Sequence, residues 1–334
     1  MTTRHRFAAA LGLAIALLDI PAWAADPVSI VYIPKNNGNP YFDSIVKGFE
    51  DGCKKPDCEF TTVGPATAEA TSQIPFVTAQ VQRGVQVIAI SPNSPDALNA
   101  VFDRARAKGT LIISVNSDMP GSEVHRDAAI LPVDFAKTGP SQVELLGSQI
   151  GYEGEIAILS ATTDAPDQNV WIAAMKDTLA KDPKYAKMKL VKVAYGNDDP
   201  QKSSTETEAL LASYPNLRGI IAPTTVGVAA AAQVVETARK APQVKVVGLG
   251  TPNQMRRFID NGTVQAFQLW SPYNEGLLAA HFARGVRSGK IKNAPGTVFE
   301  VPGLGSVKID AQNVIRTQPD LTTFDRRNIG NFNF

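Results

Sequence analysis

The feature that most constrains the fold is a strand–loop–helix unit, residues 30–50, whose pattern recurs along the chain. A run of β-branched and apolar residues stops at Pro34, a polar turn follows, and a helical pattern begins at Pro40. Proline suits the first helical position because its ring presets φ and no N–H donor is needed there. Beyond Pro40, apolar residues recur every three or four positions, which is typical of a helix packed on a sheet. A series of such units predicts a parallel, doubly wound sheet.

The units fall into two series. The first contains predicted strands over 30–33, 59–63, 85–91 and 111–115, with helices over 69–82 and 97–108. After a linking strand over 130–134, the second contains strands over 156–159, 190–194, 219–222, 244–248 and 264–270, with helices over 142–150, 168–181, 203–213, 228–240 and 252–261. A late helix over 273–288 and a strand over 297–301 return the chain to the first series. We therefore predict an α/β protein of two doubly wound lobes, the N-terminal lobe from 25–133 plus 272–302 and the C-terminal lobe from 134–271 plus 303–334.

The beginning of the chain predicts export. Arg4 to Arg6 precede an apolar run over 7–18, and Ala22 and Ala24 form a small-x-small cleavage pattern, so residues 1–24 are predicted to be a signal peptide. No later stretch reaches about 18 uninterrupted apolar residues. The 334-residue chain is 44% hydrophobic with a net charge of +1, which suits two domains and favours neither nucleic acid nor an anionic membrane as a partner. We expect a soluble periplasmic monomer.

The chain has two cysteines, Cys53 and Cys58, in the turn that follows the first helix. In an oxidising compartment this spacing favours a local disulfide. A loop this short would contribute only about 2 kcal/mol. Two thiols without a neighbouring histidine do not suit zinc, and we expect neither a metal nor a cofactor.

Candidate binding residues gather where strands end, because the loops at the carboxyl ends of parallel strands face the ligand crevice. They are Lys35, Asn39, Tyr41, Phe42, Asn116 and Asp118 in the first series, and Asp167, Gln168, Pro223, Thr224, Thr225 and Trp270 in the second. Amides and carboxylates bond to hydroxyl groups, and aromatic faces cover C–H groups, so this mixture favours a neutral polyol. No GxGxxG or GxxxxGK pattern indicates a phosphate site.

For several of these residues a structural role is an alternative to ligand binding. Asp118 and Asp167 could cap helices, and Thr224 or Thr225 could do the same at the start of the helix over 228–240. For Trp171, which lies inside a predicted helix, packing is the favoured role. His281 is expected to be a surface or hydrogen-bonded histidine.

Six segments carry a family resemblance: IPKNNGNPYF, SVNSDMP, DAPDQNVW, IIAPTTVG, VVGLGTPNQM and FQLWSPYNEG. In this order they resemble the type I periplasmic sugar-binding proteins of ABC transporters, in the branch of the rhamnose-binding and autoinducer-2-binding proteins. The resemblance implies two lobes joined by three hinge strands. It also implies ligand contacts at Lys35, Asp118, Asp167, Gln168 and Pro223, with Tyr41 and Phe42 stacking on the ligand.

The resemblance implies a binding protein that delivers a monosaccharide to a membrane permease. A chemoreceptor is a further possible partner, and the sequence contains no residues that favour or exclude it. Asn116 and Thr225 depart from the autoinducer-2 pattern, and Gly250 replaces the aspartate of ribose binders, so a rhamnose-like deoxyhexose is favoured over autoinducer-2, the alternative. A secreted glycoside hydrolase is disfavoured, because Lys35 would keep both Asp118 and Asp167 ionised and leave no proton donor.

Overall fold

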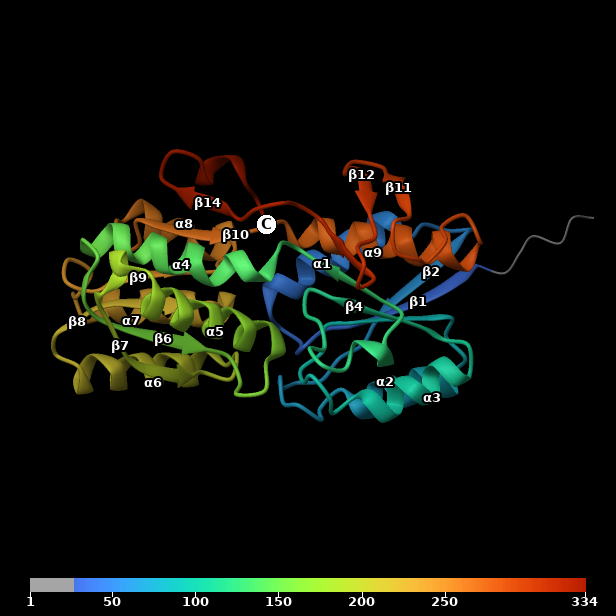
Figure 1. The fold of residues 1–334 in the computed structure, drawn as a ribbon, viewed down its shortest axis with the longest axis horizontal. Helices are drawn as coiled ribbons and strands as arrows, with labels where there is room; N and C mark the ends of the chain where they lie inside the picture. The colour runs from blue at the N-terminus through green and yellow to red at the C-terminus, as the bar shows by residue number, and fades with distance from the viewer. Residues whose placement is uncertain (1–26) are drawn as a thin grey trace, which may run out of the picture.

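The computed structural model describes residues 27–334, so the predicted signal peptide lies outside the described residues. Two groups of strands and helices lie side by side (Figure 1). The first lobe is built on a six-stranded sheet in which every pair of neighbours is parallel. Its order is β13 (Val314–Arg316), β5 (Ala128–Leu131), β4 (Leu111–Val115), β3 (Val87–Ile90), β1 (Val28–Ile33) and β2 (Cys58–Thr62). The central strands are buried on both faces, as their continuous apolar sequences require.

The second lobe is built on a four-stranded parallel sheet. Its order is β7 (Lys187–Tyr195), β6 (Glu153–Ser160), β8 (Leu217–Ala222) and β9 (Lys245–Gly248). A bridge between Leu249 and Gln268 places β10 (Ala266–Leu269) beside the end of β9, and β10 pairs with β14 (Thr322–Asp325). The prediction of an α/β protein with two parallel sheets is therefore confirmed.

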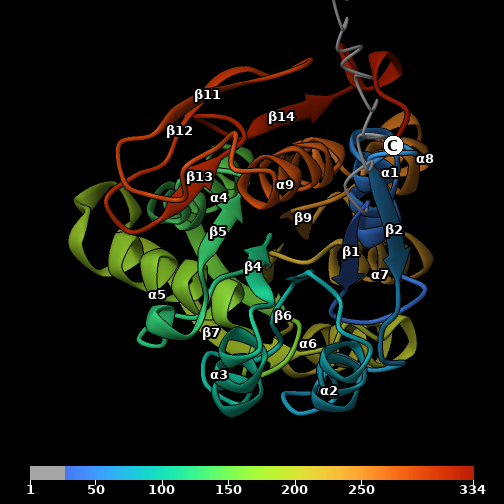
Figure 2. The ribbon, with the colours of Figure 1, turned by 90° about the vertical axis from the view of Figure 1, so that its right-hand side faces the viewer.

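Helices cover both faces of each sheet. In the first lobe α1 (Pro40–Gly52) packs with α9 (Pro272–Arg287) on one face, and α2 (Ile74–Gln82) packs with α3 (Asn99–Ala107) on the other (Figure 2). In the second lobe α4 (Phe135–Ile150) packs with α5 (Pro166–Lys181), and α6 (Pro200–Ser213) packs with α7 (Thr225–Thr237). The remaining helix, α8 (Pro252–Asp260), contacts α7. Within residues 27–334, none of the helices has the length and apolar character needed to span a bilayer.

Two glycines bring α1 and α9 into backbone contact. A Cβ added at Gly48 would collide with the carbonyl oxygen of Tyr273, and one added at Gly276 would collide with that of Ile45. Only residues without a side chain permit so close an approach of two helices. This contact fixes Tyr41, near the start of α1, relative to Glu275 in the first turn of α9.

The chain passes between the lobes three times. The connections run over 132–134, 270–271 and 317–321, between strands and helices of different lobes. Two of them lie side by side, because the N–H groups of Thr317 and Gln318 donate to the carbonyl oxygens of Leu131 and Pro132. The side chain of Gln318 accepts from the N–H of Ser271, which links the third connection, over 270–271, to the other two.

The structure differs from the sequence prediction at several element boundaries and in the assignment of the C-terminal segment. The prediction assigned residues 303–334 wholly to the second lobe, but β13 pairs with β5 of the first sheet, and only β14 lies with the second lobe. Helix α4 begins at Phe135 and runs through Pro140, so the predicted helix over 142–150 is too short at its start. The predicted strand over 297–301 corresponds to β11 (Val298–Val301), which pairs with β12 (Gly305–Lys308) in a separate hairpin.

Candidate functional site

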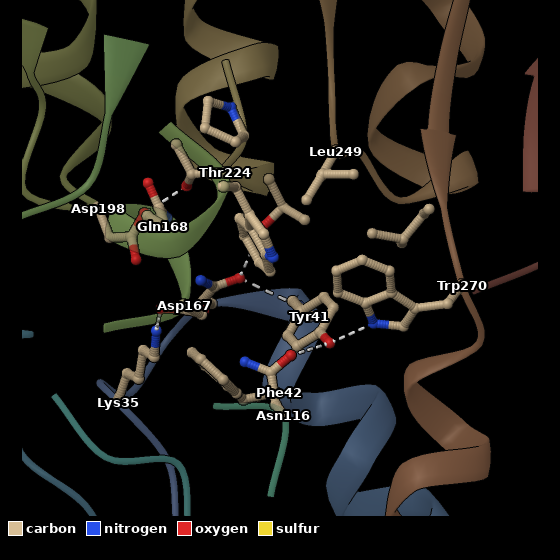
Figure 3. A pocket seen from close by; sticks show the side chains of 15 residues that line it. Lys35, Tyr41, Phe42, Asn116, Asp167, Gln168, Asp198, Thr224, Leu249 and Trp270 are labelled. Carbon is tan, nitrogen blue, oxygen red and sulfur yellow. Dashed lines mark hydrogen bonds and ion pairs between the residues drawn. The ribbon is translucent and has the colours of Figure 1, made fainter. Parts of the chain in front are cut away.

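A cavity lies between the lobes. Eleven of the twelve predicted binding residues line it: Lys35, Asn39, Tyr41, Phe42, Asn116, Asp167, Gln168, Pro223, Thr224, Thr225 and Trp270. The other lining residues are Trp171, Asp198, Leu249 and Leu269. Figure 3 shows charged and amide groups on one side of this cavity and Leu249 with Trp270 on the other. Residues separated by more than 200 positions in the chain therefore share one small space.

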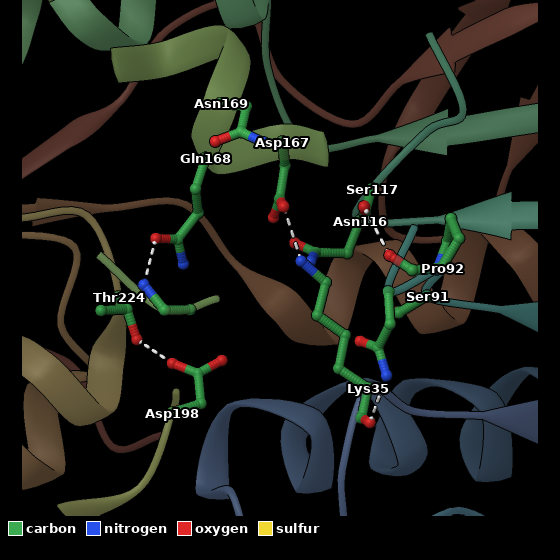
Figure 4. A network of polar contacts seen from close by, with 12 residues as sticks. Lys35, Ser91, Pro92, Asn116, Ser117, Asp167, Gln168, Asn169, Asp198 and Thr224 are labelled. Carbon is green, nitrogen blue, oxygen red and sulfur yellow. Dashed lines mark hydrogen bonds and ion pairs between the residues drawn. The ribbon is translucent and has the colours of Figure 1, made fainter. Parts of the chain in front are cut away.

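Lys35 and Asp167 form an ion pair across the cleft. The Nζ of Lys35 lies 2.6 Å from Oδ1 of Asp167, and each side chain is only 4% exposed. Figure 4 shows the side chains of Lys35 and Asp167 directed toward one another. Lys35 follows β1, and its carbonyl oxygen accepts from the side chain of Asn93, which fixes the loop. Asp167 lies in the first turn of α5, where the helix dipole favours a negative charge. A buried pair of this kind keeps two strong hydrogen-bonding groups at the cavity wall.

Gln168 is held by hydrogen bonds that orient its amide group. Its Oε1 accepts from Ser160 Oγ at 2.6 Å and from the N–H of Ala161 at 2.8 Å. Both bonds use the amide oxygen, so Nε2 remains as a donor at the cavity. A ligand hydroxyl oxygen is a suitable acceptor for it.

Asp198 is a cavity residue that the sequence analysis missed. It follows β7 with a positive φ of 52°, is buried, and accepts a hydrogen bond from Thr224 Oγ1. Burial raises the pKa of Asp198, and Asp167 raises it further, against the lowering effects of Thr224 and Lys35. The sequence could have indicated Asp198, because the polar turn over 196–199 follows a predicted strand of the second series just as the other candidate loops do.

Aromatic rings form the opposite wall. Tyr41 and Trp270 meet edge to face with ring centroids 6.5 Å apart, and Trp171 lies 5.8 Å from Trp270. Trp171 packs in the core as predicted, since it is 2% exposed, but it also lines the cavity. Rings in these positions offer flat apolar surfaces beside the polar groups.

The structure corrects the prediction for Asp118, which is not among the residues that line the cavity. Its two carboxylate oxygens each accept from Arg126 at 2.6 Å. The Arg126 side chain is 2% exposed and that of Asp118 is 14% exposed. Asn116 has a positive φ of 67°, so the chain turns directly after β4 and only Asn116 lies at the cavity. Asp118 therefore acts as the partner of a buried arginine.

The predicted helix-capping alternatives have different outcomes. Asn39, for which no capping role was predicted, caps α1, with its Oδ1 accepting from the N–H of Tyr41 at 3.1 Å. Helix α5 begins at Pro166, so Asp167 lies inside its first turn rather than at the cap. Thr224 is the N-cap residue of α7, but its hydroxyl bonds to Asp198 and makes no cap hydrogen bond.

Cys53 and Cys58 are joined by a disulfide between the end of α1 and the start of β2, and neither lines the cavity. Among residues 27–334, no cluster of three or more His, Cys, Asp or Glu side chains could hold a metal ion.

A family model described as a periplasmic binding protein domain matches residues 30–291. Among solved structures, a solute-binding protein of an ABC transporter from Clostridium phytofermentas, with bound L-rhamnose, is 31% identical with a TM-score of 0.87. That match covers 92% of this chain and 99% of the other. A sugar ABC transporter protein from Actinomyces odontolyticus is 36% identical with a TM-score of 0.72, and the match covers 92% of this chain and 97% of the other.

Among curated proteins, the D-ribose/D-allose-binding protein of Pseudomonas aeruginosa is 24% identical over 243 residues. The alignment covers 71% of this chain and 75% of that protein.

Proposed function

Because the chain belongs to the periplasmic binding protein domain family, we propose that it is the sugar-binding component of an ABC importer and that its favoured ligand is a rhamnose-like deoxyhexose. It is a binding protein and not an enzyme. It would bind one monosaccharide in the cavity between the lobes and deliver it to a membrane permease from the periplasm. The relative with bound L-rhamnose and the sugar ABC transporter relative support this proposal.

The division of the cavity into a polar and an apolar side is the observation that carries the deoxyhexose assignment. Lys35, Asp167 and Asp198 lie on the polar side, where a bound sugar would present its hydroxyl groups. Leu249 and Trp270 lie on the other side, where the methyl group of a 6-deoxy sugar would avoid leaving a hydroxyl group unpaired (Figure 3). A fully hydroxylated hexose fits this division less well.

The test is isothermal titration calorimetry with L-rhamnose and L-mannose, which differ only in the hydroxyl group at carbon 6. We expect L-rhamnose to bind and L-mannose to bind about tenfold to a hundredfold more weakly. D-ribose, D-allose and autoinducer-2 complete the panel. Equal affinity for L-mannose would refute the deoxyhexose assignment, and absence of binding to every compound would refute the function itself.

A further inference from the structure

The hydroxyl group of Tyr41 has three buried partners. It lies 2.6 Å from Nε1 of Trp270, 2.5 Å from Oδ1 of Asn116 and 2.6 Å from Oε1 of Glu275. Glu275 is fully buried behind Tyr41 and does not itself line the cavity. Burial raises the pKa of Tyr41 well above its usual value, so this hydroxyl group keeps its proton.

A count of protons limits how these bonds are made. A phenol has one hydrogen to donate and two lone pairs that accept. The indole N–H of Trp270 is a donor only, so it occupies one lone pair. Tyr41 donates its single hydrogen either to Asn116 or to Glu275. The partner that does not receive this hydrogen must donate one to Tyr41.

An ionised Glu275 is the less favourable solution. Its Oε2 is buried without a hydrogen-bond partner among residues 27–334, so a carboxylate there would leave charge unsatisfied. Lys35, the cation that acts on Glu275, is already paired with Asp167. In the neutral form, Glu275 donates to Tyr41, and Tyr41 donates to Asn116.

The electrostatic surroundings of Glu275 agree with the neutral form. Burial raises its pKa well above the usual value, and Asp167 on α5 raises it further. The hydroxyl group of Tyr41, the indole of Trp270 and the charge of Lys35 act in the opposite direction. On β1, Tyr32 also faces this carboxyl group and has a raised pKa itself.

We propose that Glu275 is a protonated positioning residue that sets the hydrogen-bonding direction of Asn116. By filling the second lone pair of Tyr41, it leaves Tyr41 able only to donate, so Asn116 must present its oxygen to Tyr41 and its Nδ2 to the cavity. Figure 3 shows the amide nitrogen of Asn116 turned away from Tyr41, towards the side where Lys35 and Asp167 lie. This inference rests on the proposed sugar-binding function, and it assigns to the ligand an acceptor oxygen opposite Asn116.

The first test needs no ligand and no mutation. Infrared spectra at pH 8 are compared for protein with and without carbon-13 in its glutamate carboxyl groups, because exposed glutamates are ionised at this pH. We expect a neutral-carboxyl band that shifts with the label and is missing in Glu275→Gln. Absence of any label-sensitive band in the unmutated protein would overturn the proposal, even if Glu275→Gln failed to fold.

The second test uses L-rhamnose as the probe. Glu275→Gln can still donate to Tyr41 and should keep the Kd within about threefold, whereas Glu275→Leu should weaken binding about tenfold. In a Tyr41→Phe background, Glu275→Leu should have no further effect, because Glu275 acts through the Tyr41 hydroxyl group. An equal loss in both backgrounds would contradict the proposal. If unmutated protein does not bind L-rhamnose, the ligand assignment fails, and the infrared test still decides the state of Glu275.

Discussion

Two groups of hydrogen-bonded side chains at the site are built in different ways. The charged wall joins Lys35 of the first lobe to Asp167 of the second, with Asp198 and Thr224 beside them. The uncharged network of Tyr41, Asn116 and Glu275 lies within the first lobe and reaches only Trp270, at the start of a crossover. The charged wall therefore depends on how the lobes meet, whereas the uncharged network depends on packing within one lobe. A separation of the lobes would break the charged wall and leave most of the uncharged network intact.

The largest effect is expected from breaking the charged wall with Lys35→Met. This change leaves Asp167 buried without its cation, and loss of one partner of a buried pair costs about 3 kcal/mol or more. We expect L-rhamnose affinity, measured by calorimetry, to fall at least about a hundredfold. Lys47→Met is the matched control, because the Lys47 side chain is 60% exposed. A loss smaller than about tenfold would show that the ion pair does not hold the ligand.

The next largest effect is expected on stability, from a change in the contact between α1 and α9 that supports the uncharged network. Gly276→Ala adds a methyl group that collides with the backbone of α1, and we expect the free energy of unfolding in urea to fall by about 3 kcal/mol. The control is Gly330→Ala, because nothing lies within 4 Å of a Cβ added there. If the two variants unfold at the same urea concentration, the close helix contact does not constrain this lobe.

A smaller, pH-dependent effect is expected at Asp198. Because its pKa is raised in the folded protein, the stability that it contributes is present at low pH and is lost as the pH rises through the folded pKa. Asp198→Asn has no proton to lose, so its unfolding free energy should decline less than that of the unmutated protein from pH 4 upwards. Urea unfolding across this range measures the difference. The exposed Asp164→Asn is the control, and parallel curves for Asp198→Asn and unmutated protein would contradict the shift.

The smallest effect on binding is expected from Asp118→Asn, because Asp118 belongs to neither the charged wall nor the uncharged network and bonds to Arg126. Its asparagine replacement keeps the shape and one acceptor for Arg126. Calorimetry should give a Kd for L-rhamnose within about twofold of the unmutated value. A clear loss of affinity without a loss of stability would restore Asp118 as a binding residue.

Most of the residues that line the cavity were predicted from one rule, that loops at the carboxyl ends of parallel strands face the same crevice. Lys35 and Asp167 were predicted in this way, and the same rule applied to the turn over 196–199 would have included Asp198. The position of Asp118 could not be read from its sequence, because the left-handed backbone of Asn116 turns the chain away. Glu275 was out of reach, since a glutamate in a helix is ordinarily exposed and its partner Tyr41 lies 234 residues away.

The close backbone contact of α1 and α9 at Gly48 and Gly276 also bears on how the ligand specificity of such a cleft could change. Tyr41 and Glu275 depend on the mutual register of two helices, whereas Lys35, Gln168 and Thr224 stand on loops and helix starts around them. Substitutions in those loops can alter which hydroxyl groups are recognised while the helix pair stays unaltered. We expect new sugar preferences to arise by exchange of loop residues over an invariant pair of helices.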